Sequence, residues 1–226
     1  MTAQVYRLGV DIGSTTVKIA LLDDDNRIVF SDYKRHFANI RETLLELVQE
    51  ARDLLTRKTP AAAAADILLK PVITGSGGLA LAGALDIPFN QEVIAVSTAL
   101  KELAPKTDVA IELGGEDAKI IYFEHGNVEQ RMNGICAGGT GSFIDQMAAL
   151  LQVDASGLNE YAKHYHNLYD IAARCGVFAK SDIQPLINEG ATSEDLAASI
   201  FQAVVNQTFS GLACGKPIRG HIAFLG

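Results

Sequence analysis

Two stretches of the chain alternate apolar and polar residues with a period of two, and each folds back through a glycine-containing turn. Residues 6–12, 16–23 and 27–35 form the first predicted antiparallel meander, and residues 109–132 form the second. In each, an apolar run ends in a carboxylate, an apolar residue and a glycine, and a second apolar run follows. This pattern predicts a strand, a tight turn and a returning strand.

The two stretches are versions of one passage, 101 positions apart. The first copy reads VDIGSTTVKIALL from Val10, and the second reads IELGGEDAKIIYF from Ile111. Aligned, they match in the acid, the glycine, the lysine and a turn asparagine, which pair as Asp11 with Glu112, Gly13 with Gly114, Lys18 with Lys119, and Asn26 with Asn127. Such a repeat predicts a fold built twice.

Helices separate and follow the two meanders. An apolar face of period 3.6 predicts a helix over about 40–56, and the chain after the second meander is mainly helical. We therefore expect an α/β protein with a first domain over 1–98 and a second over 99–226. The other predicted elements are a strand at 67–74, a short helix opened by the turn Gly75–Gly78, helices at 92–103, 141–151, 156–165, 181–188 and 192–213, and a strand at 218–225.

The residues around each glycine turn favour phosphate binding. Glycine lets backbone amides approach a bound oxygen closely, hydroxyls and a lysine add donors, and the two acids can hold Mg²⁺ directly or through water. Neither turn is a Walker loop. Two such turns predict a polyphosphate gripped from both sides, by a site that comprises Asp11, Gly13, Ser14, Thr15, Thr16, Lys18, Glu112, Gly114 and Gly115.

Composition excludes several classes of partner. The 226 residues are 48% hydrophobic and carry a net charge of −8, without a basic run, which argues against a nucleic-acid surface. No apolar stretch approaches the ~20 residues of a membrane span, and the N-terminus lacks the features of a secretion signal. We therefore expect a cytoplasmic protein that binds neither nucleic acid nor membrane.

The three cysteines form no CxxC pair, and their odd number makes a disulfide framework an unsuitable explanation. Cys136, in NGICAGGTGSFID, and Cys175, in AARCGVFAKSDI, both precede predicted helices, where a thiolate is stabilised. Two thiolates are half of the four that a cubane iron–sulfur cluster needs, so a symmetric dimer would complete the set. For either cysteine alone a small buried core residue is the commoner role, and we assign Cys214 to packing.

Two ribonuclease-H-like domains with a nucleotide between them resemble the superfamily of sugar kinases, heat-shock chaperone ATPases and actin. Asp11 to Lys18 is similar to its first phosphate motif, and Glu112 to Lys119 to its second. The superfamily's third motif, a Gly-Gly turn for adenosine, follows a strand near the C-terminus, where this chain stops at HIAFLG. We therefore expect a C-terminally truncated chain with an incomplete adenosine site.

The motifs DIGSTTVKIA, ELGGEDAKI, CAGGTGSFID and CGVFAKSDI resemble the ATP-dependent activator of 2-hydroxyacyl-CoA dehydratases, related to the ATPase subunits of benzoyl-CoA reductase. The resemblance covers nearly the whole chain. It implies a homodimer with one [4Fe–4S] cluster between its subunits, held by Cys136 and Cys175. It also implies ATP hydrolysis coupled to transfer of one low-potential electron, from an upstream reductant to a partner dehydratase.

The second phosphate motif departs from the family pattern at two positions. The family commonly has Asp, two glycines and Gln, whereas this chain has Glu112 and Glu116. Glu112 can still serve Mg²⁺, one methylene further out. Glu116 replaces a neutral amide with a charge, which predicts an electrostatic penalty near the γ-phosphate, and slower or differently arranged hydrolysis, unless the side chain points away or helps to position water. The predicted catalytic residues are Asp11, Glu112 and Glu116.

Two other functions remain open on this fold. A small-molecule kinase of the sugar-kinase type would need a carboxylate base beside a substrate hydroxyl, which the sequence does not identify. A nucleotide-dependent scaffold that assembles like actin would polymerise on ATP addition. Neither class has a use for Cys136 and Cys175, which therefore favour the activator.

Overall fold

The computed structural model describes residues 4–58, 67–124, 126–134, 138–172 and 175–226. The chain forms two compact units, Met1–Leu103 and Ala104–Gly226, called here the first and the second unit. The domain division predicted after residue 98 falls inside a helix, α3 (Glu92–Leu103), and the assignment of functional domains stays a prediction.

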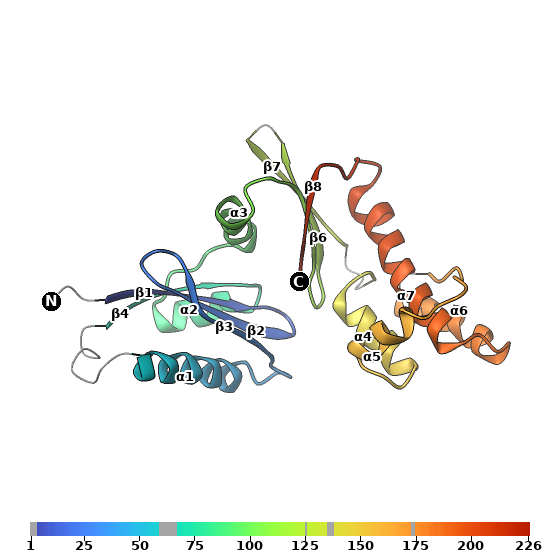
Figure 1. Cartoon of the computed structure of the whole chain (residues 1–226), viewed down its shortest axis with the longest axis horizontal. Coiled ribbons are helices and arrows are strands. Elements are labelled where there is room, and N and C mark those ends of the chain that lie inside the picture. Colours follow the sequence, from blue (N-terminus) through green and yellow to red (C-terminus); the bar gives the residue numbers. More distant parts are fainter. Residues whose placement is uncertain (1–3, 59–66, 125, 135–137, 173–174) are drawn as a thin grey trace. The chain divides into compact units, whose positions relative to one another are not determined.

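The first unit is a four-stranded mixed sheet with helices (Figure 1). The strand order is β3-β2-β1-β4, with β1 antiparallel to β2 and parallel to β4. The elements are β1 (Gln4–Ile12), β2 (Thr16–Leu22), β3 (Ile28–Arg35), α1 (Ile40–Lys58), β4 (Ile67–Thr74), α2 (Gly78–Leu85) and α3.

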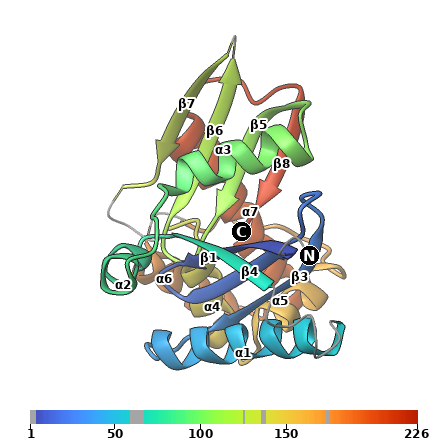
Figure 2. The same ribbon diagram turned by 90° about the vertical axis from the view of Figure 1, so that its left-hand side faces the viewer.

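Alternation along β1 separates the two faces of this sheet. Tyr6, Leu8, Val10 and Ile12 are buried, whereas Asp11 lies on the opposite face. The buried residues share one core with α1, which runs along that face of the sheet in Figure 2. The face that carries Asp11 is therefore not the one that α1 covers.

The second unit repeats the sheet. Its strand order is β7-β6-β5-β8, again with an antiparallel neighbour on one side of the central strand and a parallel neighbour on the other. Its strands are β5 (Thr107–Leu113), β6 (Ala118–Glu124), β7 (Asn127–Met132) and β8 (His221–Leu225).

Helices between β7 and β8 form a second hydrophobic core of their own, around Phe143, Met147 and Ile183. Asp154 caps the N-terminus of one of them, accepting a hydrogen bond from the Gly157 backbone amide at 2.7 Å. The helices are α4 (Gly141–Leu150), α5 (Ala155–Ala162), α6 (Gly176–Asn188), α7 (Ser193–Gln207) and a π-helix, η2 (Thr208–Ala213).

The duplication predicted from the sequence is present in the hydrogen-bond register. Asp11 pairs with Lys18 across β1 and β2, and Glu112 pairs with Lys119 across β5 and β6. The five paired positions of the second hairpin all correspond to pairs in the first after a shift of 101 residues. The sequence repeat is therefore a structural repeat.

Two helix predictions differ from the structure. Helix α6 begins at Gly176 rather than at residue 181, because Gly176, Val177 and Phe178 are weak helix formers and propensity did not predict this first turn. The Ala179 amide donates to the Cys175 carbonyl at 3.0 Å and closes the turn. The single helix expected over 192–213 ends at Gln207 and continues as the π-helix η2. Hydrophobic periodicity does not distinguish these two helix types.

Candidate functional site

The first glycine turn lies between β1 and β2. The Gly13 backbone amide donates to the Thr16 carbonyl at 2.9 Å, which closes the turn. Lys18 Nζ lies 3.2 Å from Asp11 Oδ2, and both side chains are partly exposed. The predicted hydroxyl residues of this turn, Ser14, Thr15 and Thr16, are half-buried at its tip.

A histidine that the sequence did not single out supports this turn. His36 is 7% exposed, and its backbone amide donates to the Thr15 carbonyl at 3.1 Å. Its Nδ1 accepts from the Ala38 amide at 3.1 Å, so Nε2 carries the proton of the neutral ring and donates to the Gly13 carbonyl at 3.3 Å. The buried His36 thus stabilises the turn through its Gly13 and Thr15 carbonyls. No spacing around His36 in the sequence signals this role.

The second glycine turn, between β5 and β6, is more enclosed. Lys119 Nζ lies 3.5 Å from Glu112 Oε1, and their side chains are 8% and 20% exposed. The other carboxylate oxygen, Glu112 Oε2, is buried and has no hydrogen-bond partner among the described residues. Glu116 is exposed at the tip, and its predicted role in catalysis stays a prediction.

Helix α4 binds directly to this second turn. The Gly141 amide donates to the Gly114 carbonyl at 2.9 Å, and the Ser142 amide donates to the Gly115 carbonyl at 2.8 Å. These amides belong to the first turn of α4, where backbone donors lack partners within the helix. A Cβ at Gly141 would lie 3.2 Å from the Gly114 oxygen, so only a residue without a side chain allows this approach freely.

The same helix contacts Gly176, the residue that follows one of the predicted cluster ligands. Cys175 is half-buried and occupies the N-cap of α6, as the prediction of a helix N-terminus required. The next residue, Gly176, lies so close to α4 that a Cβ there would be 2.6 Å from Gln146 Oε1. Helix α4 therefore contacts the second glycine turn at one end and the Cys175 segment further along.

The other two cysteines have different outcomes. Cys136 lies outside the described residues. The assignment of Cys214 to packing is wrong, because the residue is exposed in a left-handed conformation (φ 46°) at the end of η2. Its thiol donates back to the Ser210 and Gly211 carbonyls, an interaction that needs no burial.

Some sites are absent from the part of the chain that the structure describes. It contains no group of three or more His, Cys, Asp or Glu side chains that could hold a metal ion. Within the same residues, no helix combines the length and apolar character needed to cross a membrane.

Comparison with known proteins gives close structural relatives. The (R)-2-hydroxyglutaryl-CoA dehydratase activating ATPase of Acidaminococcus fermentans is 29% identical over 210 residues, which cover 92% of this chain and 77% of the relative. The crystal structure of component A of that organism's dehydratase matches with a TM-score of 0.81 at 26% identity, covering 97% of this chain and 82% of that one. The activator of 2-hydroxyisocaproyl-CoA dehydratase from Clostridium difficile, solved with bound ADPNP, matches with a TM-score of 0.79 at 26% identity, covering 98% and 80%.

These matches confirm the predicted actin-like ATPase fold, an α/β architecture with two mixed sheets. The model of the BadF/BadG/BcrA/BcrD ATPase family matches residues 8–221, from the middle of β1 to the start of β8. This range contains both glycine turns and Cys175. The chain therefore belongs to the BadF/BadG/BcrA/BcrD ATPase family.

Proposed function

We propose that this protein is an ATP-dependent activator that passes one low-potential electron from an iron–sulfur cluster to a 2-hydroxyacyl-CoA dehydratase-type partner. An upstream low-potential reductant would reload the cluster, and ATP hydrolysis would drive the transfer. The membership in the ATPase family and the activator names of the relatives support this function.

The nucleotide half of the proposal rests on the two glycine turns. Glu112 Oε2 is a buried carboxylate oxygen without a partner among the described residues, which is costly unless a ligand completes the site. Mg²⁺ prefers carboxylate oxygen and water, so Asp11 and Glu112 suit it. Asp11 and Glu112 would hold Mg²⁺, which would supply charge neutralisation for the phosphates, and Lys18 and the Gly13 and Gly114 turns would orient them.

The proposed coupling between the nucleotide site and the cluster rests on one observation, that α4 contacts both the second glycine turn and the segment that contains Cys175. The first amides of α4 bind the Gly114 and Gly115 carbonyls, and its Gln146 lies against Gly176, beside Cys175. A change at the phosphate turn would therefore move a helix that also contacts Gly176, the neighbour of a proposed cluster ligand. Such coupling needs a nucleotide that binds the two conformations with different affinity.

The cluster half of the proposal needs a second copy of the chain. Cys136 and Cys175 would supply two thiolates, and a [4Fe–4S] cluster takes four, so two copies related by a twofold axis would share one cluster. Cys175 fits this role, because a helix N-terminus stabilises a thiolate. Val177 and Phe178, which follow Gly176, are 70% and 65% exposed and offer an apolar surface to the second copy.

The test is anaerobic purification followed by iron and acid-labile sulfide analysis and a visible absorption spectrum. We expect about two irons and two sulfides per chain, one cluster per dimer. A Cys136→Ala, Cys175→Ala variant should lose both. The matched control is Cys214→Ala, which removes an exposed thiol outside the proposed ligand set and should retain the cluster.

Iron-free monomeric protein under strict anaerobiosis would contradict the activator. The same preparation then separates the alternatives. ATP turnover that depends on a sugar would indicate a kinase, whereas polymerisation on ATP addition would indicate an actin-like scaffold.

A further inference from the structure

A buried hydroxyl lies at the end of β4, next to the first glycine turn. Thr74 Oγ1 is buried and has no hydrogen-bond partner among the described residues. Thr74 is the register partner of Asp11 in the parallel pair of β1 and β4, so the two side chains extend from the same face of the sheet. This is the face that α1 leaves uncovered.

The turn after Thr74 is built around Asp11. Gly75 has φ +94°, and a Cβ there would lie 2.3 Å from the Ile12 carbonyl oxygen and 2.5 Å from Asp11 Oδ1. The Gly77 amide donates to the same Ile12 carbonyl at 2.9 Å. The Asp11 carboxylate therefore directs one oxygen to the end of β4, while the other meets Lys18.

The second unit shows that the fold does not need this hydroxyl. Leu225 is the register partner of Glu112, as Thr74 is of Asp11, and a glycine follows each. A Cβ at Gly226 would lie 2.6 Å from the Leu113 carbonyl oxygen, the counterpart of the approach of Gly75 to Ile12. The same strand end is thus built with leucine in one unit and with an unsatisfied threonine in the other.

A buried hydroxyl without a partner destabilises the folded protein, so its presence beside a phosphate turn calls for a ligand. We infer that Thr74 is a positioning residue of the nucleotide site, whose Oγ1 accepts a hydrogen bond from a Mg²⁺-bound water that Asp11 also holds. This inference rests on the proposed nucleotide function. Mg²⁺ keeps several of its waters when it binds protein and phosphate, and these waters need acceptors.

The test compares Thr74→Val with Thr74→Ser and with a matched control, Ser97→Ala. Valine keeps the shape and strand preference of threonine and replaces the hydroxyl with a methyl group, and serine restores the hydroxyl. Ser97 Oγ, on α3, is likewise buried and without a partner among the described residues, but Ser97 lies on a helix and does not pair with Asp11 in the sheet. Thermal unfolding of the protein without nucleotide is measured first, and ADPNP binding is then titrated at several Mg²⁺ concentrations and in EDTA.

We expect Thr74→Val to leave the melting temperature unchanged or raised, and to weaken Mg²⁺-dependent ADPNP binding about tenfold, the loss expected for one hydrogen bond to a charged group. Binding in EDTA should not change. Thr74→Ser should restore the Mg²⁺ dependence, and Ser97→Ala should leave it as in the wild type.

Two results would overturn the inference while the proposed function stands. One is a lower melting temperature or failure to fold in Thr74→Val, which would mean that the hydroxyl has a structural partner such as an ordered water. The other is a Thr74→Val protein that binds Mg²⁺ and ADPNP as the wild type does. Wild-type protein that binds no nucleotide at any Mg²⁺ concentration would overturn the proposed function and the inference together.

Discussion

The two units carry the same hairpin in the same register, but they bury it to different extents. The side chains of Lys18 and Asp11 are 41% and 30% exposed, whereas those of Lys119 and Glu112 are 8% and 20% exposed. A repeated motif has therefore become two electrostatic environments. An ion pair exposed to water contributes little to the free energy of unfolding. Removal of one partner of a buried pair leaves an uncompensated buried charge and destabilises the protein.

The hydrogen bonds that support the two glycine turns also differ. In the first unit His36 donates to the Thr15 and Gly13 carbonyls, and the Gly77 amide at the N-cap of α2 donates to the Ile12 carbonyl. In the second unit the first amides of α4 bind the carbonyls of Gly114 and Gly115. The second turn is thus tied by backbone hydrogen bonds to α4, whereas the first turn is supported by His36 and by the segment that precedes α2.

The largest expected effect comes from removing one lysine at a time. Lys119→Met leaves the Glu112 carboxylate buried without its cation, so we expect a loss of about 3 kcal/mol in the free energy of unfolding. Lys18→Met exposes Asp11 to water and should cost less than about 1 kcal/mol. Urea denaturation of both variants without nucleotide measures the difference. Equal losses would show that the two environments are energetically alike.

Sequence alone predicted the parts of this comparison that depend on local pattern. The two meanders and their shared register follow from periodicity, turn residues and the repeat. The sequence also indicated a helix after Cys175, although it placed the start of that helix five residues too late. The parts that depend on tertiary packing were not predictable. The burial of Lys119 and the attachment of α4 to Gly114 come from segments that no local pattern relates to these residues.

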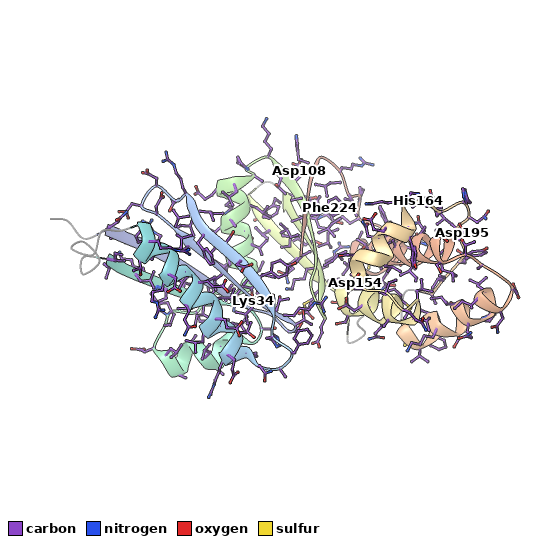
Figure 3. The ribbon with its side chains drawn as sticks, turned by 60° about the horizontal axis from the view of Figure 1, so that its bottom comes forward. Lys34, Asp108, Asp154, His164, Asp195 and Phe224 are labelled. Carbon is purple, nitrogen blue, oxygen red and sulfur yellow. The ribbon has the colours of Figure 1, made fainter. Side chains whose placement is uncertain are left out.

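The next-largest effect concerns the hydrophobic core that the helices of the second unit form among themselves. Asp195, at the start of α7, is 3% exposed, and Figure 3 shows it among the helices of the second unit. Its Oδ1 accepts from the Asn167 amide at 2.9 Å and the His166 amide at 2.7 Å. These hydrogen bonds, first the one from Asn167 and then the one from His166, lower the pKa of Asp195 to about 2. The carboxylate thereby holds the segment that leads from α5 toward Cys175.

We expect Asp195→Asn to lower the melting temperature by several degrees at pH 7, because the amide loses the charge that these donors stabilise. A carboxyl whose folded pKa lies below its unfolded value of about 3.9 contributes stability above that value and loses it as the pH falls toward about 2. The difference between wild type and variant should therefore close between about pH 4 and pH 2. Calorimetry over this range measures it.

The control for this prediction is Asp53→Asn, which changes an exposed acid on α1 of the first unit. Its melting temperature should follow that of the wild type across the same pH range. If the difference in melting temperature between the wild type and Asp195→Asn stayed constant down to pH 2, the charge of Asp195 would not be the cause of its stabilising effect.

The smallest effect concerns a lysine that bridges two glutamates in each unit. In the first unit, Lys34 Nζ lies 2.7 Å from Glu50 and 3.2 Å from Glu46 on α1, and Figure 3 shows Lys34 beside that helix. The hydrogen bonds to Glu50 and then Glu46 raise the pKa of Lys34. The side chain is 33% exposed, so water screens the attraction.

The counterpart in the second unit has one more partner. Lys216 Nζ lies 2.7 Å from Glu129 and 3.0 Å from Glu124, whose hydrogen bonds raise its pKa in that order. It also lies 4.2 Å from the centre of the Tyr122 ring, and its side chain is 19% exposed. A cation over an aromatic face is attracted by the ring quadrupole, an interaction that salt screens less when the cation is shielded from water.

We therefore expect Lys34→Met to lower the melting temperature by about 1–2 °C at low salt and to have no effect in 1 M NaCl, because exposed ion pairs are weak and screened. Lys216→Met should cost more, and part of its effect should persist in 1 M NaCl through the lost contact with the Tyr122 ring. Thermal unfolding at the two salt concentrations measures both. If salt abolished both effects equally, burial would not distinguish the two lysines, and the contrast between the units would be confined to their glycine turns.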